Sequence, residues 1–77
     1  MKEAVELIVK ALAHDPESVD VRELNRDQRT TVIEVRVAQG DMGKVIGRQG
    51  RTIKALRVLL HAAGMKHNHR YVLEVVE

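Results

Sequence analysis

The fold of this chain is decided by the stretch Ile46-Gly47-Arg48-Gln49-Gly50-Arg51, which combines two closely spaced glycines with two arginines. Glycines three positions apart allow the backbone to turn through conformations that other residues rarely adopt. They also let a phosphate approach the main chain without meeting a Cβ atom. The N–H groups that begin the following helix then point at the phosphate, and the helix dipole favours its negative charge. The stretch therefore predicts a turn that grips the sugar-phosphate backbone of a single nucleic-acid strand.

The distribution of charge supports an anionic partner. The chain carries a formal net charge of +2, but residues 1–34 sum to −3, whereas residues 35–70, which contain the glycines, sum to +7. A basic segment around such a turn is typical of proteins that bind a polyanion. Charge alone also fits a solvated basic face, so the prediction depends on charge and turn together.

Composition limits the size and class of the protein. The 77 residues suffice for one small domain, residues 1–77, with a thin core. The absence of cysteine excludes disulfides and thiolate metal sites. Glu3 and Glu6 interrupt the first apolar pattern, so no signal peptide is expected, and no apolar run approaches the roughly 20 residues that span a bilayer. We therefore expect a soluble, cytoplasmic protein.

Aromatic residues are almost absent, because Tyr71 is the only one. RNA-binding modules that stack bases on the aromatic side chains of a sheet need several of them. In this chain the bases are expected to rest against aliphatic groups, and the affinity is expected to come mainly from the phosphates.

Hydrophobic periodicity predicts the element order helix, strand, strand, helix, helix, strand. The first helix is expected over residues 2–14 and ends at Asp15-Pro16, since a residue before proline is biased away from helix. Its apolar set is Ala4, Leu7, Ile8, Ala11 and Leu12, widened by Val5 and Val9. Strands are indicated near residues 19–22, 33–37 and 71–76, with a turn at residues 25–28.

Two further helices are expected around the glycines. Asp41 is a good N-cap for a short helix over residues 42–46. A longer helix is predicted over residues 51–63, with Gly64 as its C-terminal stop.

The longer helix carries two apolar stripes and one basic stripe, because successive residues are about 100° apart around the axis. The first apolar stripe consists of Ile53, Leu56, Leu60 and Ala63, the second of Ala55, Val58, Leu59 and Ala62, and the basic stripe of Lys54, Arg57 and His61. One apolar stripe must face the sheet. The other is either additional core or a surface for a partner, since small domains rarely leave such stripes in water.

Other readings of these motifs are weaker. A P-loop requires Ser or Thr after the lysine, but Val45 follows Lys44, and Val45 also stands where the dinucleotide fingerprint needs a glycine. His67 and His69, with His61 nearby in sequence, lack the further ligands that a zinc site needs. No nucleophile stands beside a base, so we expect no enzyme. Because the nucleotide motifs and the zinc ligands are incomplete, we also expect no cofactor and no metal.

The stretch Gly43-Lys44-Val45-Ile46-Gly47-Arg48-Gln49-Gly50-Arg51-Thr52-Ile53-Lys54-Ala55-Leu56-Arg57 resembles the KH domain, whose hallmark is Ile-Gly-x-x-Gly followed by a basic helix. The element order resembles the type II arrangement of bacterial KH domains, and residues 15–23 are similar to the stand-alone KH proteins of bacteria. The resemblance covers essentially the whole chain. It implies an α+β fold, α-β-β-α-α-β, in which helices cover one face of a three-stranded sheet.

The resemblance also implies a site that binds about four single-stranded nucleotides of RNA. In that site Gly47 and Gly50 shape a clamp, Arg48 and Gln49 form its tip, and Ile46 floors the groove for the bases. The residues that meet phosphates are Lys44, Arg51 and Lys54.

A role as an RNA chaperone is implied as well, with regulation of the cell envelope and cell shape in some bacteria. Such KH proteins form homodimers or pair with a larger KH protein of the Jag type, and we expect this contact at Ala55, Val58, Leu59 and Ala62. The alternative is a KH fold that serves mainly for dimerisation and protein interaction, with incidental RNA contact.

Overall fold

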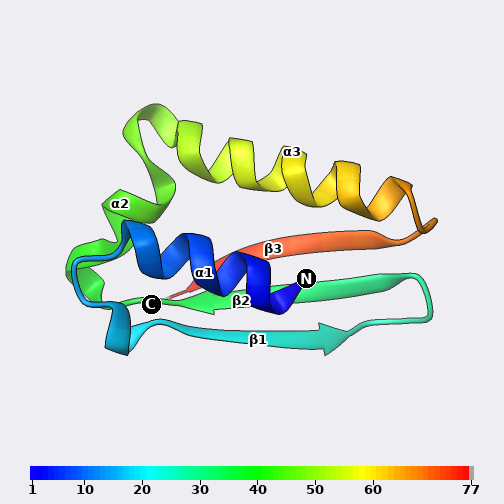
Figure 1. Cartoon of the computed structure of the whole chain (residues 1–77), viewed down its shortest axis with the longest axis horizontal. Coiled ribbons are helices and arrows are strands. Elements are labelled where there is room, and N and C mark those ends of the chain that lie inside the picture. Colours follow the sequence, from blue (N-terminus) through cyan, green and yellow to red (C-terminus); the bar gives the residue numbers. More distant parts are fainter. Residues whose placement is uncertain (77) are drawn as a thin grey trace.

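The protein has the expected order α-β-β-α-α-β, joined by short 3-10 turns (Figure 1). The structure is a computed structural model and describes residues 1–76. Its elements are α1 (Lys2–Leu12), β1 (Asp20–Asn25), β2 (Thr30–Arg36), α2 (Met42–Ile46), α3 (Arg51–Met65) and β3 (Arg70–Val76). The molecule measures 35 × 22 × 17 Å along its principal axes.

The sheet has the strand order β1-β2-β3, with β2 at its centre. β1 runs antiparallel to β2, with Val21 opposite Val35, and β3 runs parallel to β2, with Leu73 opposite Ile33. A parallel pair needs a crossover connection, and α2, the glycine residues and α3 provide it. The outer edge of β3 is consequently left without a neighbouring strand in the described sheet.

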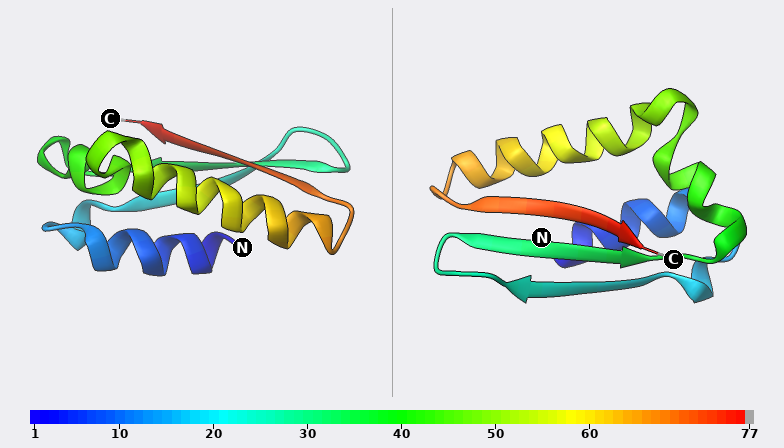
Figure 2. Two further views of the ribbon diagram at one scale, coloured as in Figure 1. Left: turned by 90° about the horizontal axis from the view of Figure 1, so that it is seen from above. Right: turned by 180° about the vertical axis from the view of Figure 1, so that it is seen from behind.

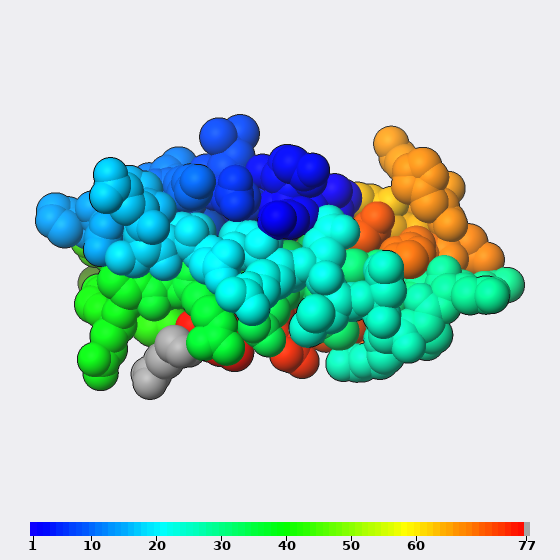
Figure 3. Space-filling model, turned by 90° about the horizontal axis from the view of Figure 1, so that it is seen from below, coloured from blue at the N-terminus to red at the C-terminus, as the bar shows by residue number. Residues whose placement is uncertain are grey.

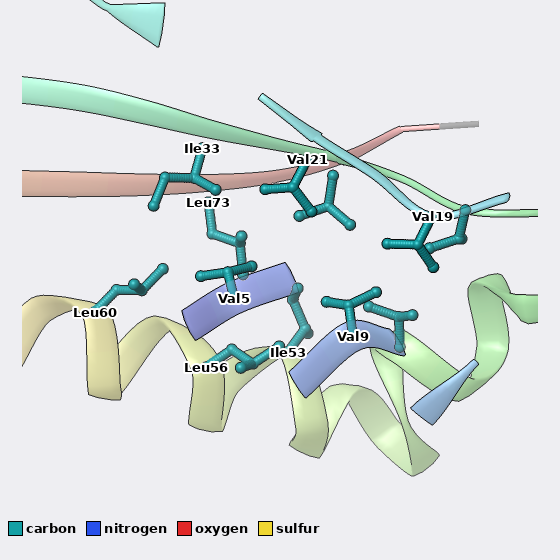
Figure 4. Packing of buried hydrophobic residues seen from close by; sticks show 12 residues of the cluster. Val5, Val9, Val19, Val21, Ile33, Ile53, Leu56, Leu60 and Leu73 are labelled. Atoms are coloured by element: carbon teal, nitrogen blue, oxygen red, sulfur yellow. The ribbon is translucent and has the colours of Figure 1, made fainter. Parts of the chain in front are cut away.

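Helices cover one face of the sheet, as the resemblance implies. α3 packs along β3 and α1 packs along β1, and in the rear view of Figure 2 the strands lie in front of α1. The core between these layers is built from aliphatic side chains of every layer (Figure 4). Its main members are Val5, Val9, Val21, Ile33, Val35, Val45, Ile53, Leu56, Leu60 and Leu73.

The buried face of α1 differs from the apolar set that periodicity favours. Val5 and Val9 are the buried residues of this helix, while the five residues of the expected set are exposed: Ala4, Leu7, Ile8, Ala11 and Leu12. The helix is apolar around much of its circumference, so periodicity alone leaves the direction of the sheet open. Val5 and Val9 stand one turn apart, and their side chains fill the space between the sheet and α3 (Figure 4).

Two carboxylates hold α1 in place, one at each end. The Lys2 backbone N–H donates to Oε1 of Glu23 on β1 at 2.8 Å. Beyond the other end, Asp41 accepts the backbone N–H groups of His14 at 3.0 Å and Asp15 at 2.9 Å. These contacts fix α1 to the strand on one side and to the start of α2 on the other.

Asp41 therefore has a different role from the one that its position suggests. It stands at the N-cap of α2, but its side chain makes no cap hydrogen bond. The N–H groups of Asp15 and His14 lower the pKa of the buried Asp41 carboxyl, and the charge of Lys44 adds to the effect. The expected N-cap position and helix bounds are confirmed, but the side chain does not cap α2, because the donors that bind this carboxylate come from a distant part of the chain.

Gly64 also differs from expectation, since α3 continues through it to Met65. A Cβ atom on Gly64 would collide with the carbonyl oxygen of His69. The glycine is required by this close approach of the returning chain rather than by a helix stop. The turn that follows places Asn68 at a φ of 51°.

The strands are longer than alternation predicts. β1 extends to Asn25, and β2 already begins at Thr30 because the hairpin closes with a bond from the Arg26 N–H to the Thr30 carbonyl at 2.9 Å.

Within residues 1–76, no helix has both the length and the apolar character needed to cross a bilayer.

Candidate nucleic-acid interface

The glycine turn, residues 47–50, joins α2 to α3 through three residues with positive φ. The φ angles are 80° at Gly47, 58° at Gln49 and 73° at Gly50. The turn closes with a bond from the Gly50 N–H to the Gly47 carbonyl at 3.0 Å. A Cβ atom on Gly47 would collide with the side chain and backbone of Thr52. Glycine at 47 is thus required both by its φ angle and by space.

The tip of the turn presents polar side chains to solvent. Arg48 and Gln49 are exposed, and the Gln49 Oε1 accepts a hydrogen bond from Nη2 of Arg51 at 3.2 Å. Lys54 is exposed one turn further along α3. Within residues 1–76, no ion pair involves Arg48, Arg51 or Lys54. These cations are available for an external anion.

Ile46 and Lys44 flank the turn on the α2 side. Ile46 is 37% exposed, and its neighbour Val45 anchors the helix in the core. The ammonium group of Lys44 lies 3.7 Å from Oδ1 of Asp41. A phosphate at Lys44 would therefore share it with that carboxylate.

The first turn of α3 is open to an anion. Gly50 occupies its N-cap position, no side chain caps the helix, and the first turn contains no acidic residue. The first N–H groups of a helix have no partner within the helix, and the dipole makes this end attractive to negative charge. The helix start thus opens directly beside the exposed cations of the turn.

A groove of about 400 Å³ runs between α3 and the free edge of β3. It is lined by Arg57, His61, Arg70, Tyr71, Val72 and Leu73. The basic stripe of α3 indicated two of these residues, although it did not assign them to the site. Arg70 and Tyr71 went unrecognised, because only the packing of α3 along β3 brings them opposite that stripe.

The sequence model of the KhpA/KhpB KH domain matches residues 2–75 of the chain. The protein belongs to the KhpA/KhpB family of KH domains. Its relatives include the RNA-binding protein KhpA of Clostridium perfringens, 45% identical over 76 residues, which are 99% of this chain and all of the relative. KhpA of Aquifex aeolicus is 46% identical over 77 residues, all of this chain and 96% of the relative. KhpA of Chlamydia trachomatis is 44% identical over 77 residues, all of this chain and 97% of the relative.

No solved structure matches the chain significantly. The KhpA/KhpB assignment agrees with the observed topology, and the expected KH fold is thereby confirmed.

In this KhpA/KhpB chain the second apolar stripe of α3 lies outside the core. Ile53, Leu56 and Leu60 of the first stripe are buried, whereas Val58 is 66% and Leu59 is 60% exposed. Ala55 and Ala62 are exposed as well, and Met65 extends the stripe.

The exposed stripe continues onto α1 through an apolar hollow of about 190 Å³. The hollow lies between the two helices and is lined by Met1, Ala4, Val5, Ile8, Leu56, Leu59 and Leu60. Ala4 and Ile8, two members of the expected apolar set of α1, thus form one apolar surface with Leu59 and the exposed stripe of α3.

The histidines of this KhpA/KhpB chain have separate surroundings. The ring of His69 packs against Tyr71, with 4.8 Å between the centroids, and its Nε2 lies 2.8 Å from Oγ1 of the buried Thr31. His61 lines the groove, whereas His67 lies in the turn beyond α3. Within the described part of the chain, no three His, Asp or Glu side chains gather as metal ligands would.

Proposed function

We propose that this protein binds single-stranded RNA by clamping the sugar-phosphate backbone in the glycine turn. One observation carries the proposal: a turn that only glycine permits at position 47 opens onto the uncapped start of α3, beside exposed cations that form no ion pair within residues 1–76. This arrangement suits phosphates, since backbone N–H groups and guanidinium groups both bind their oxygens. The relatives in three distant bacteria are named RNA-binding proteins, which supports RNA as the ligand.

In this proposal the phosphates lie against Arg48, Arg51 and Lys54, with Lys44 at one side. The bases turn into the groove between α3 and β3, over Ile46 and the aliphatic side chains of β3. Since the groove offers one aromatic ring, that of Tyr71, base stacking contributes little and phosphate contacts dominate the affinity. Weak base preference suits an RNA chaperone that acts on many RNAs in the cytoplasm. No step of this role requires a catalytic group.

Charge reversal at the tip of the turn tests the clamp. Arg48→Asp/Gln49→Asp should abolish binding of a fluorescent single-stranded RNA in anisotropy titrations, because carboxylates there repel phosphate. Both side chains are exposed, so the melting temperature should stay within about 2 °C of wild type. The matched control Arg22→Asp/Gln28→Asp changes net charge equally on exposed residues away from the glycine turn and should retain most of the affinity for an RNA of four nucleotides. Undiminished affinity in the folded tip variant would rule out the clamp.

The exposed apolar stripe favours a second function, which is pairing with another protein chain. We propose that Ala55, Val58, Leu59 and Ala62 pack against the same helix of a second copy, or against a larger KH protein of the Jag type. The small alanines let two helices approach closely, and a two-fold axis would bury each stripe on its mate. A homodimer would also carry two glycine turns, which raises avidity for a longer RNA.

The alternative role, a dimerisation module with incidental RNA contact, makes a different prediction for the tip variant. If pairing is the working function, Arg48→Asp/Gln49→Asp should lose RNA crosslinking in cells and still complement a deletion strain. If RNA binding is the working function, the same variant should keep its partner and fail to complement.

A further inference from the structure

We infer that Arg29 and Arg70 form a second phosphate-binding site, at the end of the molecule opposite the glycine turn, for a later nucleotide of the same RNA strand. The inference rests on the proposed function, since it extends the path of the RNA that the turn grips. It concerns a hollow lined by residues of the β1–β2 hairpin and of the turn between α3 and β3. Figure 1 shows these two turns at the same end of the molecule.

The hollow is basic and free of carboxylates. It measures about 390 Å³ and is lined by Arg29, Met65, Asn68, His69 and Arg70. In Figure 3 the hairpin and the turn after α3 lie together at one end, while α2 lies at the other. Within residues 1–76, no ion pair involves either arginine. The carboxylate of Asp27, in the same hairpin, accepts the backbone N–H of Arg29 at 2.8 Å. This hydrogen bond does not involve the guanidinium group of Arg29.

The backbone that carries the two arginines is fixed by contacts between distant segments. The Arg70 N–H donates to the carbonyl oxygen of Arg29 at 2.6 Å, which holds the two residues beside each other. The His69 N–H donates to the Gly64 carbonyl at 2.9 Å, and the His69 ring bonds to Thr31. The two guanidinium groups therefore extend from a shared and ordered base. Such groups bind phosphate through paired N–H donors.

The hollow continues the groove proposed for the bases. Arg70 lines both of them, and Arg57 and His61 lie along the groove on the side of α3. α3 has 15 residues, so at 1.5 Å per residue about 22 Å separate its start at the glycine turn from its end at the hollow. A KH clamp holds four nucleotides. Only an RNA longer than the clamped segment can reach the second site.

The length of the RNA therefore separates the two sites experimentally. Oligouridines of 4 and 12 nucleotides are titrated against wild type and Arg29→Glu/Arg70→Glu, by anisotropy and by the amide shifts of ¹⁵N-labelled protein. The 12-mer should bind wild type more tightly and shift the amides of both arginines, which the 4-mer should not. The variant should lose about tenfold in affinity for the 12-mer, and keep its 4-mer affinity within twofold. Its log K against log salt should become less steep by about 1.4, at roughly 0.7 per single-strand contact.

Control variants guard against general charge effects and misfolding. Lys10→Glu/Arg22→Glu makes the same change in net charge on exposed residues elsewhere and should alter both affinities less than twofold. Arg29→Gln/Arg70→Gln removes the charges without introducing carboxylates and should show the same preferential loss for the 12-mer, to a smaller extent.

Three results would overturn the inference: no gain in affinity from 4 to 12 nucleotides, equal losses for both RNAs, or equal losses in the control variant. In each of these cases the 4-mer still binds, and the proposed clamp stands. If neither RNA binds wild type, the proposed function fails first, and the second site fails with it.

Discussion

Gly47 is the residue on which the geometry of the glycine turn most depends. It combines a φ of 80° with a position where any Cβ atom would collide with Thr52. Gly43, four residues earlier in α2, has no positive φ, and nothing lies within 4 Å of the place where its Cβ would be. The two glycines therefore form a natural pair of test and control.

We expect Gly47→Ala to destabilise the protein by roughly 1–3 kcal/mol, because it combines strain in φ with a steric collision. RNA affinity should fall as the turn is displaced. Gly43→Ala should leave the glycine turn intact. It should raise the free energy of unfolding by up to about 1 kcal/mol, since alanine favours a helix. Urea denaturation measures both changes through the midpoint at constant m. Equal stability of Gly47→Ala and wild type would mean that the turn relaxes readily.

At the level of elements, α1 is linked by one buried carboxylate to the helix that leads into the turn. Asp41 accepts two N–H groups beyond the end of α1, and Asp41 itself stands directly before α2, at its N-cap position. The position of α2, and with it the entrance to the glycine turn, is therefore coupled to the position of α1.

The lowered pKa of Asp41 predicts a specific loss of stability in acid. The folded-state pKa lies below the unfolded value of about 3.9. The stabilisation is therefore complete above the unfolded pKa and is lost as pH falls through the folded pKa. Urea midpoints from pH 6 to pH 2.5 should fall more steeply below pH 4 in wild type than in Asp41→Asn. The variant should also melt roughly 5–10 °C lower at pH 7, because a neutral amide satisfies the two N–H groups poorly.

The comparison needs a second variant, because the pKa of Asp27 is also lowered, mainly by the Arg29 N–H. Asp27→Asn should remove only the part of the acid-dependent loss of stability that comes from the β1–β2 hairpin. If Asp41→Asn showed the same acid dependence as wild type, other carboxylates would be responsible for it.

At the scale of the whole molecule, the apolar surface of α3 and α1 predicts association. We expect wild type to sediment as a dimer at high concentration, or as a complex when a larger KH partner is present. Val58→Asp should be a folded monomer, because it strands a charge inside the contact while its side chain lies outside the core. Analytical ultracentrifugation with circular dichroism tests both statements. Leu60→Asp, at a buried position of the same helix, is the contrasting variant and should unfold.

A monomeric wild type at high concentration would end the homodimer proposal and leave the heterodimer. Unfolding of Val58→Asp would mean that the stripe supports the fold of a single chain.

The parts of the structure that follow from local pattern could be predicted from the sequence. The order of helices and strands, the glycine turn and the two apolar stripes of α3 are all consequences of residue spacing. The helix and strand periods are set by backbone geometry, so the neighbours of a residue in sequence suffice to indicate them.

The failures all involve partners that only folding brings together. The donors to Asp41 come from His14 and Asp15, and the reason for Gly64 is the carbonyl of His69. The inward face of α1 depends on where the sheet and α3 leave space. Arg70 lines the groove because β3 lies beside α3, and no local pattern around residue 70 indicates that.

The parallel pairing of β2 with β3 has a consequence for how the protein folds. Residues 37–69 lie between these strands, and this segment includes the whole glycine turn. To form this pair, the chain must close a long loop, and the entropy of closure is lost before the contacts between the strands can compensate for it. Proteins rich in such distant contacts fold slowly for this reason. We expect the turn to reach its folded geometry only when that loop is closed, so a nascent or partly unfolded chain would lack the proposed clamp. RNA bound in the proposed clamp would bind the native state alone, and by mass action it would stabilise the folded protein.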